Sequence, residues 1–171
     1  WEYPVSGGLY DGKPEDSENY TKLAAAFRTE LDAIGDYELT IAAPAGPKTI
    51  ENYDLADLAA QLDFINVMAY DLNGSWSDAT GHNAPLYPVS SDDKLNADSA
   101  IQAYLDAGIP SEKIIMGLAY YGRAFAGVSA TNNGLNQSFS GVPMGTWEAG
   151  LFDYWDIKNN ILTDANFKRY W

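Results

Sequence analysis

The chain has 171 residues, of which 46% are hydrophobic and 20% charged, as expected for a globular domain rather than a disordered chain. The absence of cysteine excludes disulfides, thiolate metal sites and cysteine nucleophiles. No apolar run approaches the roughly 18 residues that span a bilayer, so we expect no membrane partner. The net charge of −14 disfavours a nucleic-acid partner, because phosphate backbones would be repelled. With His82 as the single histidine, we expect neither a metal nor another cofactor.

Helical periodicity appears first between residues 17 and 34. Apolar side chains recur there every three or four positions, which predicts an amphipathic helix with Ser17 as its N-cap and Gly35 at its C-terminal end. Weaker patterns of the same kind predict helices over 55–62 and 97–107.

Short apolar runs at 38–43, 64–70 and 114–120 predict three buried strands that alternate with these helices. Alternation of this kind predicts an α/β fold with a parallel sheet, either part of a (β/α)8 barrel or an open doubly wound sheet. No G-x-G-x-x-G motif follows a strand, so a dinucleotide site has no support. Residues 71–95 form a polar loop too long for an ordinary connection, which predicts a functional role.

Polar and aromatic residues stand where the apolar runs end. Glu2, Tyr70-Asp71 and Tyr121-Gly122-Arg123 each occupy such a junction, and in a barrel these junctions meet at one rim. Carboxylates, phenols and a guanidinium there would suit general acid chemistry on a neutral polar substrate. Aromatic residues make up 13% of the chain, which favours sugars, whose C–H faces stack on rings. Ordinary surface positions would explain each residue alone equally well.

Four segments of the chain carry a family resemblance: residues 1–4 (WEYP), 63–71, 113–125 and 145–150. Together they resemble family 18 glycoside hydrolases, the chitinases. Trp1-Glu2-Tyr3-Pro4 resembles the end of the acidic motif on the fourth barrel strand of that family. Residues 63–71 (DFINVMAYD) resemble the sixth strand, and residues 113–125 (KIIMGLAYYGRAF) the seventh. Residues 145–150 (GTWEAG) resemble part of the α+β insertion domain of one subgroup. The resemblance covers essentially the whole chain and is closest to bacterial secreted chitinases.

The resemblance implies a partial (β/α)8 TIM barrel at residues 1–124, holding the end of strand four and strands five to seven. Residues 125–171 would begin the α+β insertion domain. Strands one to three and eight are missing, and a barrel needs about 250 residues. We therefore expect an internal fragment whose partners include the missing barrel segments of its own parent chain. We expect the fragment alone to show weak or no turnover.

The activity that the resemblance implies is hydrolysis of β-1,4 bonds in chitin by retaining, substrate-assisted catalysis. The expected catalytic residues are Glu2 as proton donor, Tyr70 as the phenol that orients the acetamido group, and Asp71 as a carboxylate around the scissile bond. The expected ligand is chitin or an N-acetylglucosamine oligosaccharide. An insoluble polymer cannot enter a cell, so we expect a secreted, extracellular protein.

Further residues match groups that line the sugar-binding cleft of the family. Trp76 would be an aromatic platform, and Met68 would wall the acetamido pocket. The full expected substrate-binding set is Tyr3, Met68, Trp76, Tyr121, Arg123, Trp147 and Glu148.

Three other functions stay open. The chain could come from a non-catalytic, lectin-like chitin-binding relative, although such proteins lose the proton donor that Glu2 matches. It could come from an endo-β-N-acetylglucosaminidase acting on N-glycans, although these usually lack an insertion like residues 145–150. It could also be a structural piece that complements another chain.

Overall fold

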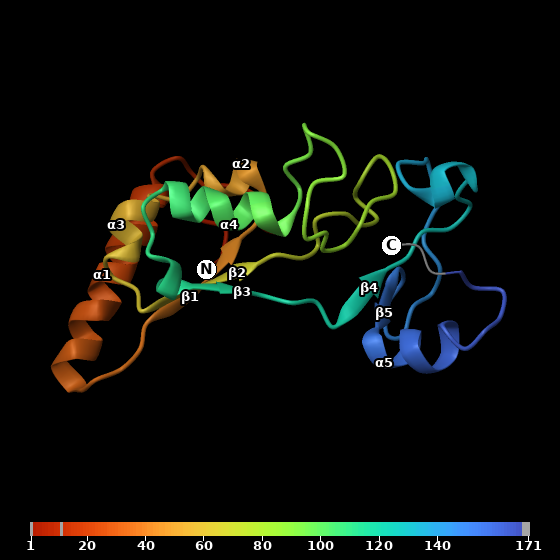
Figure 1. Ribbon diagram of the computed structural model, residues 1–171. Helices are drawn as coiled ribbons and strands as arrows, with labels where there is room; N and C mark the ends of the chain where they lie inside the picture. Colours follow the sequence, from red (N-terminus) through yellow and green to blue (C-terminus); the bar gives the residue numbers. More distant parts are fainter. Residues whose placement is uncertain (1, 11, 169–171) are drawn as a thin grey trace. The chain divides into compact units, whose positions relative to one another are not determined.

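The computed structural model describes residues 2–10 and 12–168 (Figure 1). Trp1 of the Trp-Glu-Tyr-Pro segment and the closing residues 169–171 lie outside the described residues. The chain divides into two compact units, the first within residues 1–69 and 85–117 and the second within residues 70–84 and 118–171. The expected boundary between barrel and insertion domain, at residues 124 and 125, falls inside the second unit and stays a prediction.

A parallel three-stranded sheet organises the first unit. Its strands run in the order β1 (Thr40–Pro44), β2 (Phe64–Met68) and β3 (Ile114–Met116). Thr40 pairs with Phe64 on one side of β2, and Ile115 pairs with Asn66 on the other. Since parallel neighbours need crossover connections, a helical segment separates each strand from the next. The predicted alternation is confirmed in this unit.

The helices of the first unit are α1 (Asp16–Ile34), α2 (Pro47–Ile50), α3 (Leu55–Ala59) and α4 (Ala97–Asp106), with a short 3₁₀ turn, η1 (Ser111–Lys113), before β3. Helix α4 begins where Asn96 accepts a hydrogen bond from the Ser99 backbone N–H at 2.8 Å. Figure 1 shows α4 running beside α2, and these two helices contact each other. The hydrophobic core includes Leu58, Ile65, Val67 and Tyr104, which are fully buried.

Two details of the sequence prediction are wrong. Helix α1 begins at Asp16 with Glu15 at the cap position, so Ser17 is inside the helix. The carboxylate of Asp16 accepts the Lys13 backbone N–H at 2.8 Å, and this contact shapes the entry. Strand β3 is also shorter than the apolar run at 114–120. Its pairing ends with the hydrogen bond from the Gly117 N–H to the Val67 carbonyl at 2.8 Å, because β2 itself ends at Met68.

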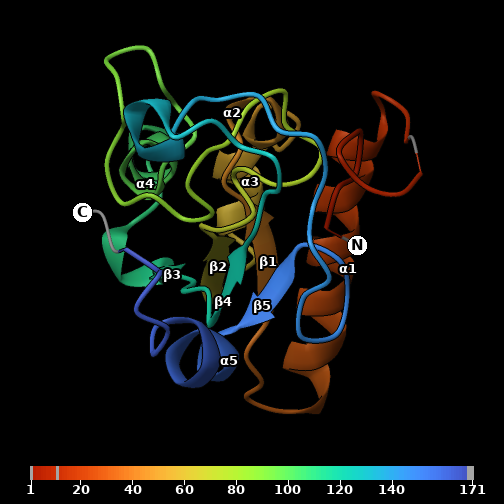
Figure 2. The ribbon, with the colours of Figure 1, turned by 90° about the vertical axis from the view of Figure 1, so that its right-hand side faces the viewer.

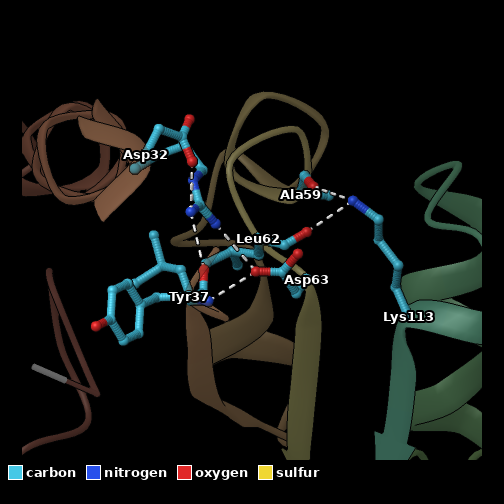
Figure 3. Close-up of polar contacts among 8 residues, drawn as sticks. Asp32, Tyr37, Ala59, Leu62, Asp63 and Lys113 are labelled. Carbon is cyan, nitrogen blue, oxygen red and sulfur yellow. Dashed lines mark hydrogen bonds and ion pairs between the residues drawn. The ribbon is translucent and has the colours of Figure 1, made fainter. Parts of the chain in front are cut away.

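Charged side chains join the segments that lead into the three strands (Figure 3). The carboxylate of Asp63 accepts hydrogen bonds from Arg28 at 3.1 Å and from the Leu39 N–H at 2.7 Å. Lys113 donates from Nζ to the carbonyls of Ala59 and Leu62, at 3.0 and 2.7 Å. Ala59 is the last residue of α3, where backbone carbonyls lack a partner within the helix, and Leu62 lies in the turn that follows.

The second unit is built on an antiparallel pair, β4 (Tyr121–Arg123) and β5 (Leu151–Asp153), which lie side by side in Figure 2. A short 3₁₀ turn, η2 (Thr131–Gly134), precedes β5, and α5 (Tyr154–Asp156) and η3 (Ile157–Ile161) follow it. The first part of the long loop, residues 70–84, belongs to this unit. Thr80 ties it there, since its backbone and hydroxyl make four hydrogen bonds with Gly134, Asn136 and Gln137. The predicted loop is confirmed, since no helix or strand lies between Met68 and Ala97.

Candidate functional site

Asp71 occupies an unusual backbone position directly after Tyr70. Its φ of 56° lies in the left-handed region, which costs an L-residue about 1–2 kcal/mol but which Asp tolerates better than most. The Asp71 N–H donates to Oδ1 of Asn83 at 3.0 Å, and the next amide, that of Leu72, donates to the Asn83 carbonyl at 3.0 Å. The loop thus closes on itself and fixes the direction of the Asp71 side chain.

The Asp71 carboxylate is the centre of a hydrogen-bonded cluster with β4. Arg123 donates to Oδ1 from Nε at 2.9 Å and to Oδ2 from Nη2 at 2.8 Å. This two-pronged geometry is the strongest form of the arginine–carboxylate pair. The Tyr121 hydroxyl donates to the same Oδ1 at 2.7 Å. Tyr121 and Arg123 are two positions apart on β4, so their side chains share one face of the strand.

Aromatic rings surround the Arg123 guanidinium. Its central carbon lies 5.0 Å from the centroid of the Trp76 ring and 5.5 Å from that of Tyr121, both within cation–π range. The Tyr70 ring meets the Tyr121 ring edge to face, with centroids 6.2 Å apart. Trp76 nevertheless stays 57% exposed, which leaves ring surface for a ligand. Cluster A is our name for Tyr70, Asp71, Trp76, Tyr121 and Arg123.

The electrostatics of cluster A keep the Tyr121 hydroxyl protonated. Burial raises the pKa of Tyr121, and its hydrogen bond to Asp71 and the charge of that carboxylate raise it further. The phenol is therefore a hydrogen-bond donor throughout the physiological range. Cluster A as a whole presents fixed polar groups between exposed aromatic surface, an arrangement that suits hydroxyl and amide groups on a sugar.

Glu2 and Tyr3 lie in the first unit. Glu2 is exposed, and its side chain and that of Tyr3 line an open hollow of about 620 Å³ with Gly7, Gly8, Leu9 and Tyr10. Burial raises the pKa of Tyr20, and the negative charge of Glu2 raises it further. Gly7 has a φ of 101°, and the Tyr3 ring lies close against it, so a larger residue there would disturb the hollow. The convergence of Glu2 with cluster A stays a prediction.

Met68 is the last residue of β2 and pairs with Pro44 of β1. It is half-buried at the carboxyl end of the sheet. Its predicted role in an acetamido pocket stays a prediction.

Trp147 and Glu148 lie in the tight turn before β5. A side chain at Gly145 would collide with the carbonyl oxygens of Glu148 and Leu151, so only glycine fits. The Trp147 indole N–H donates to Oδ2 of Asp153 at 2.8 Å while the ring stays 78% exposed. Trp155 donates to the same oxygen at 3.2 Å. Glu148 is exposed beside Trp147.

Sequence reasoning missed three polar residues that hold these side chains. Asn83 contacts Asp71, Thr80 anchors the long loop, and Asp153 binds two indoles. The only available signal for Asn83 and Thr80 was their place in a loop already judged too long to be a simple connection. Nothing in the local pattern marked Asp153.

The sequence model of one protein family, the glycosyl hydrolases family 18, matches residues 1–171. The chain belongs to family 18. Over 188 residues it is 43% identical to chitinase A1 of Niallia circulans, an alignment that covers 100% of this chain and 27% of that protein. The solved structure of chitinase ChiA74 from Bacillus thuringiensis superposes on 100% of this family 18 chain with a TM-score of 0.92 and 32% identity.

A family 18 N-acetylglucosaminidase from Paenibacillus barengoltzii also superposes on 100% of the chain, with a TM-score of 0.85 and 32% identity. The chain covers 31% of the Bacillus structure and 51% of the Paenibacillus structure. It therefore spans about a quarter to a half of the length of these relatives.

Within residues 2–10 and 12–168, no three or more His, Asp or Glu side chains gather in a way that could hold a metal ion. In the same part of the chain, no helix combines the length and the apolar character needed to cross a membrane.

Proposed function

We propose that this chain carries part of the active site of a chitinase, which hydrolyses β-1,4-N-acetylglucosaminide bonds by retaining, substrate-assisted catalysis. The observation that carries the proposal is cluster A: a carboxylate bound by arginine and tyrosine, beside an exposed tryptophan, in a family 18 chain. Relatives named as chitinases support the same substrate class.

Glu2 is the proposed proton donor. The carbonyl oxygen of the substrate's own N-acetyl group attacks the anomeric carbon while Glu2 gives its proton to the departing glycosidic oxygen. An oxazolinium ion results. Water then attacks the anomeric carbon and passes a proton to the Glu2 carboxylate, which opens the ring with net retention. No carboxylate nucleophile is required.

Tyr70 and Asp71 act on the sugar at the cleavage site. The Tyr70 hydroxyl donates to the acetamido group and holds its oxygen beneath the anomeric carbon, which raises the rate by proximity. Asp71 accepts hydrogen bonds around the scissile bond, and Tyr121 and Arg123 line the cleft beside it. Trp76 stacks on a sugar ring on the leaving-group side.

The remaining residues shape the rest of the cleft. Met68 walls the acetamido pocket and Tyr3 lies beside the acid. Trp147 and Glu148 form a wall on the other side of the cleavage point. The exposed Trp147 ring, tethered by its indole N–H, supports this role.

In this proposal β1, β2 and β3 are strands five, six and seven of a (β/α)8 barrel, and residues 125–171 begin the α+β insertion domain. The remaining barrel segments come from the same parent chain. The natural ligand is a chitin chain, which places the protein outside the cell. The parallel sheet and the long loops that follow its strands support this assignment.

The test is release of soluble oligosaccharide from N-acetylglucosamine hexamer by the full-length parent protein, called the intact protein from here on, and by its Glu2→Gln variant. We expect at least a hundredfold lower rate from Glu2→Gln, in line with the about 10²–10⁴-fold contribution of general acid–base catalysis. The matched control is Glu30→Gln, which changes an exposed carboxylate on α1 and should leave the rate unchanged. Equal rates for Glu2→Gln and the intact protein would remove Glu2 from the acid role.

The anomeric form of the first product tests the stereochemistry. Substrate assistance requires a β product from a β substrate and no cleavage of a cellulose oligomer, which lacks the acetamido group. An α product would reject the proposed mechanism.

Two other outcomes would favour the alternative functions. Binding of the hexamer without cleavage would indicate a lectin-like protein, and cleavage of an N-glycan core but not of the hexamer would indicate an endo-β-N-acetylglucosaminidase.

A further inference from the structure

We propose that Asn83 is a positioning residue that fixes the Asp71 carboxylate where Arg123 and Tyr121 meet it. The inference rests on the proposed function and extends cluster A by a residue outside it. Asn83 lies in the long loop, 12 residues beyond Asp71, and it is half-buried.

The two ends of the Asn83 side chain bind the backbones of two members of cluster A. Oδ1 accepts the Asp71 N–H at 3.0 Å, and Nδ2 donates to the Tyr121 carbonyl at 3.3 Å. The Tyr121 hydroxyl in turn donates to the Asp71 carboxylate at 2.7 Å. One primary amide therefore joins the backbones on both sides of the phenol–carboxylate hydrogen bond.

Asp71 needs such support because of its backbone conformation. A φ of 56° is unfavourable for an L-residue outside a tight turn, and Asp71 lies beyond the last ladder pair of β2, at Met68. The Asn83 amide supplies the acceptor that a neighbouring strand would otherwise provide. Without it the Asp71 N–H loses its partner and the carboxylate can move relative to Arg123. A displacement of about 1 Å at a reacting centre can cost about a hundredfold in rate.

Substitution of Asn83 can be made selective. The Asn83 carbonyl accepts the Leu72 N–H through the backbone, so this contact survives any change of side chain. Asn73 offers a matched control in the same loop. Its Nδ2 donates to the His82 carbonyl at 3.0 Å, which braces the loop as Asn83 does, but it makes no hydrogen bond with Asp71 or Tyr121 within the described residues.

A double-mutant cycle on hexamer cleavage distinguishes positioning from general bracing. The variants are Asn83→Ala, Asp71→Asn and the pair together, in the intact protein, with kcat/KM as the readout. We expect Asn83→Ala to lower kcat/KM by about tenfold or more. If Asn83 acts through Asp71, the double variant falls less than about threefold below Asp71→Asn, since contacting residues are not additive.

Three outcomes overturn the inference. The first is a kcat/KM of Asn83→Ala within about threefold of that of the intact protein, and the second is a loss of kcat/KM in Asn73→Ala as large as in Asn83→Ala. The third is a double variant whose further loss of kcat/KM, relative to Asp71→Asn, equals that of Asn83→Ala alone.

Amide hydrogen exchange gives a readout independent of catalysis. Exchange of the Asp71 amide should accelerate in Asn83→Ala and not in Asn73→Ala. If the intact protein cleaves nothing, the proposed function fails, and this exchange experiment alone decides the role of Asn83.

Discussion

The guanidinium carbon of Arg123 lies 5.0 Å from the ring centroid of Trp76. The cation supports one face of the indole while its nitrogens bind Asp71. Arg123 therefore both binds the Asp71 carboxylate and packs against Trp76, the ring on which we propose that a sugar stacks.

Arg123→Lys should weaken both functions. Lysine keeps the charge but cannot form two parallel hydrogen bonds and is more strongly hydrated, so both the Asp71 contact and the ring contact weaken. We expect kcat/KM on the hexamer to fall about tenfold or more, with a loss of about 1 kcal/mol in the free energy of unfolding. Activity assays and urea unfolding of the intact protein would measure both. Unchanged activity would mean that Arg123 is only a structural partner of Asp71.

The contrast between cluster A and the sheet explains what the sequence could predict. Strand β2 is central in the sheet, with Ile65 and Val67 fully buried on one face and the residues of the other face half-buried, so its apolar run predicts the element and its parallel pairing. The polar strand ends also pointed to Tyr70, Asp71 and Arg123. Their family roles came from the resemblance of whole segments rather than from periodicity.

The parts that could not be predicted depend on contacts between distant residues. Asn83 matters through its hydrogen bonds to Asp71 and Tyr121, which are 12 and 38 positions away. The end of β3 depends on the length of its neighbour, because an apolar run continues to residue 120 after the partner strand has stopped. No local pattern carries such information.

Asp153→Ala should weaken ligand binding at Trp147. The Asp153 carboxylate accepts the indole N–H groups of Trp147 and Trp155, and without it both exposed rings gain rotational freedom. We expect the Kd for a chitin oligomer, measured by calorimetry on the intact protein, to rise about threefold to tenfold. Asp164→Ala, at an exposed position with only local contacts, is the control. An unchanged Kd in Asp153→Ala would show that Trp147 is oriented in another way or does not touch the ligand.

Two buried tyrosines should respond in opposite directions to the loss of a hydroxyl. The Tyr104 hydroxyl donates to the Pro44 carbonyl at 2.6 Å, whereas the buried Tyr53 hydroxyl finds no hydrogen-bond partner within the described part of the chain. Tyr104→Phe should lower the free energy of unfolding by about 1–2 kcal/mol, and Tyr53→Phe should leave it equal or raise it by up to about 1 kcal/mol. Thermal and urea unfolding would measure both, and a loss in Tyr53→Phe as large as in Tyr104→Phe would contradict the assignment.

Lys113→Met should destabilise the first unit. The ammonium group donates to the carbonyls of Ala59 and Leu62. The Ala59 carbonyl also accepts the Leu62 N–H at 3.4 Å, whereas the Leu62 carbonyl has no other donor among the contacts found in the described residues. Methionine keeps the apolar stem but leaves the Leu62 carbonyl unpaired and the Ala59 carbonyl with only the long bond from Leu62, so we expect a loss of about 1–3 kcal/mol in the free energy of unfolding. Lys48→Met, at an exposed position, should change it by less than about 0.5 kcal/mol. Equal effects of the two substitutions would assign the loss to charge alone.

The stability of the protein should decline in alkaline solution because of the buried tyrosines. Burial raises the pKa of Tyr53, Tyr104 and Tyr121 above the ordinary value of 10.0. A group whose pKa is higher in the folded state keeps its proton there while the unfolded chain loses it. Its contribution is therefore fully present below pH 10 and is lost as the pH rises toward its folded pKa.

Above pH 10, Tyr53 and Tyr104, which are both buried, should each lower the free energy of unfolding by about 1.4 kcal/mol per pH unit. Urea unfolding between pH 9 and about pH 12 would measure the slope, and Tyr104→Phe should make it shallower by one such increment. If the free energy of unfolding falls equally steeply with pH in Tyr104→Phe and in the intact protein, the pKa of Tyr104 is the same in the folded and the unfolded chain. Its burial against the Pro44 carbonyl argues against that result.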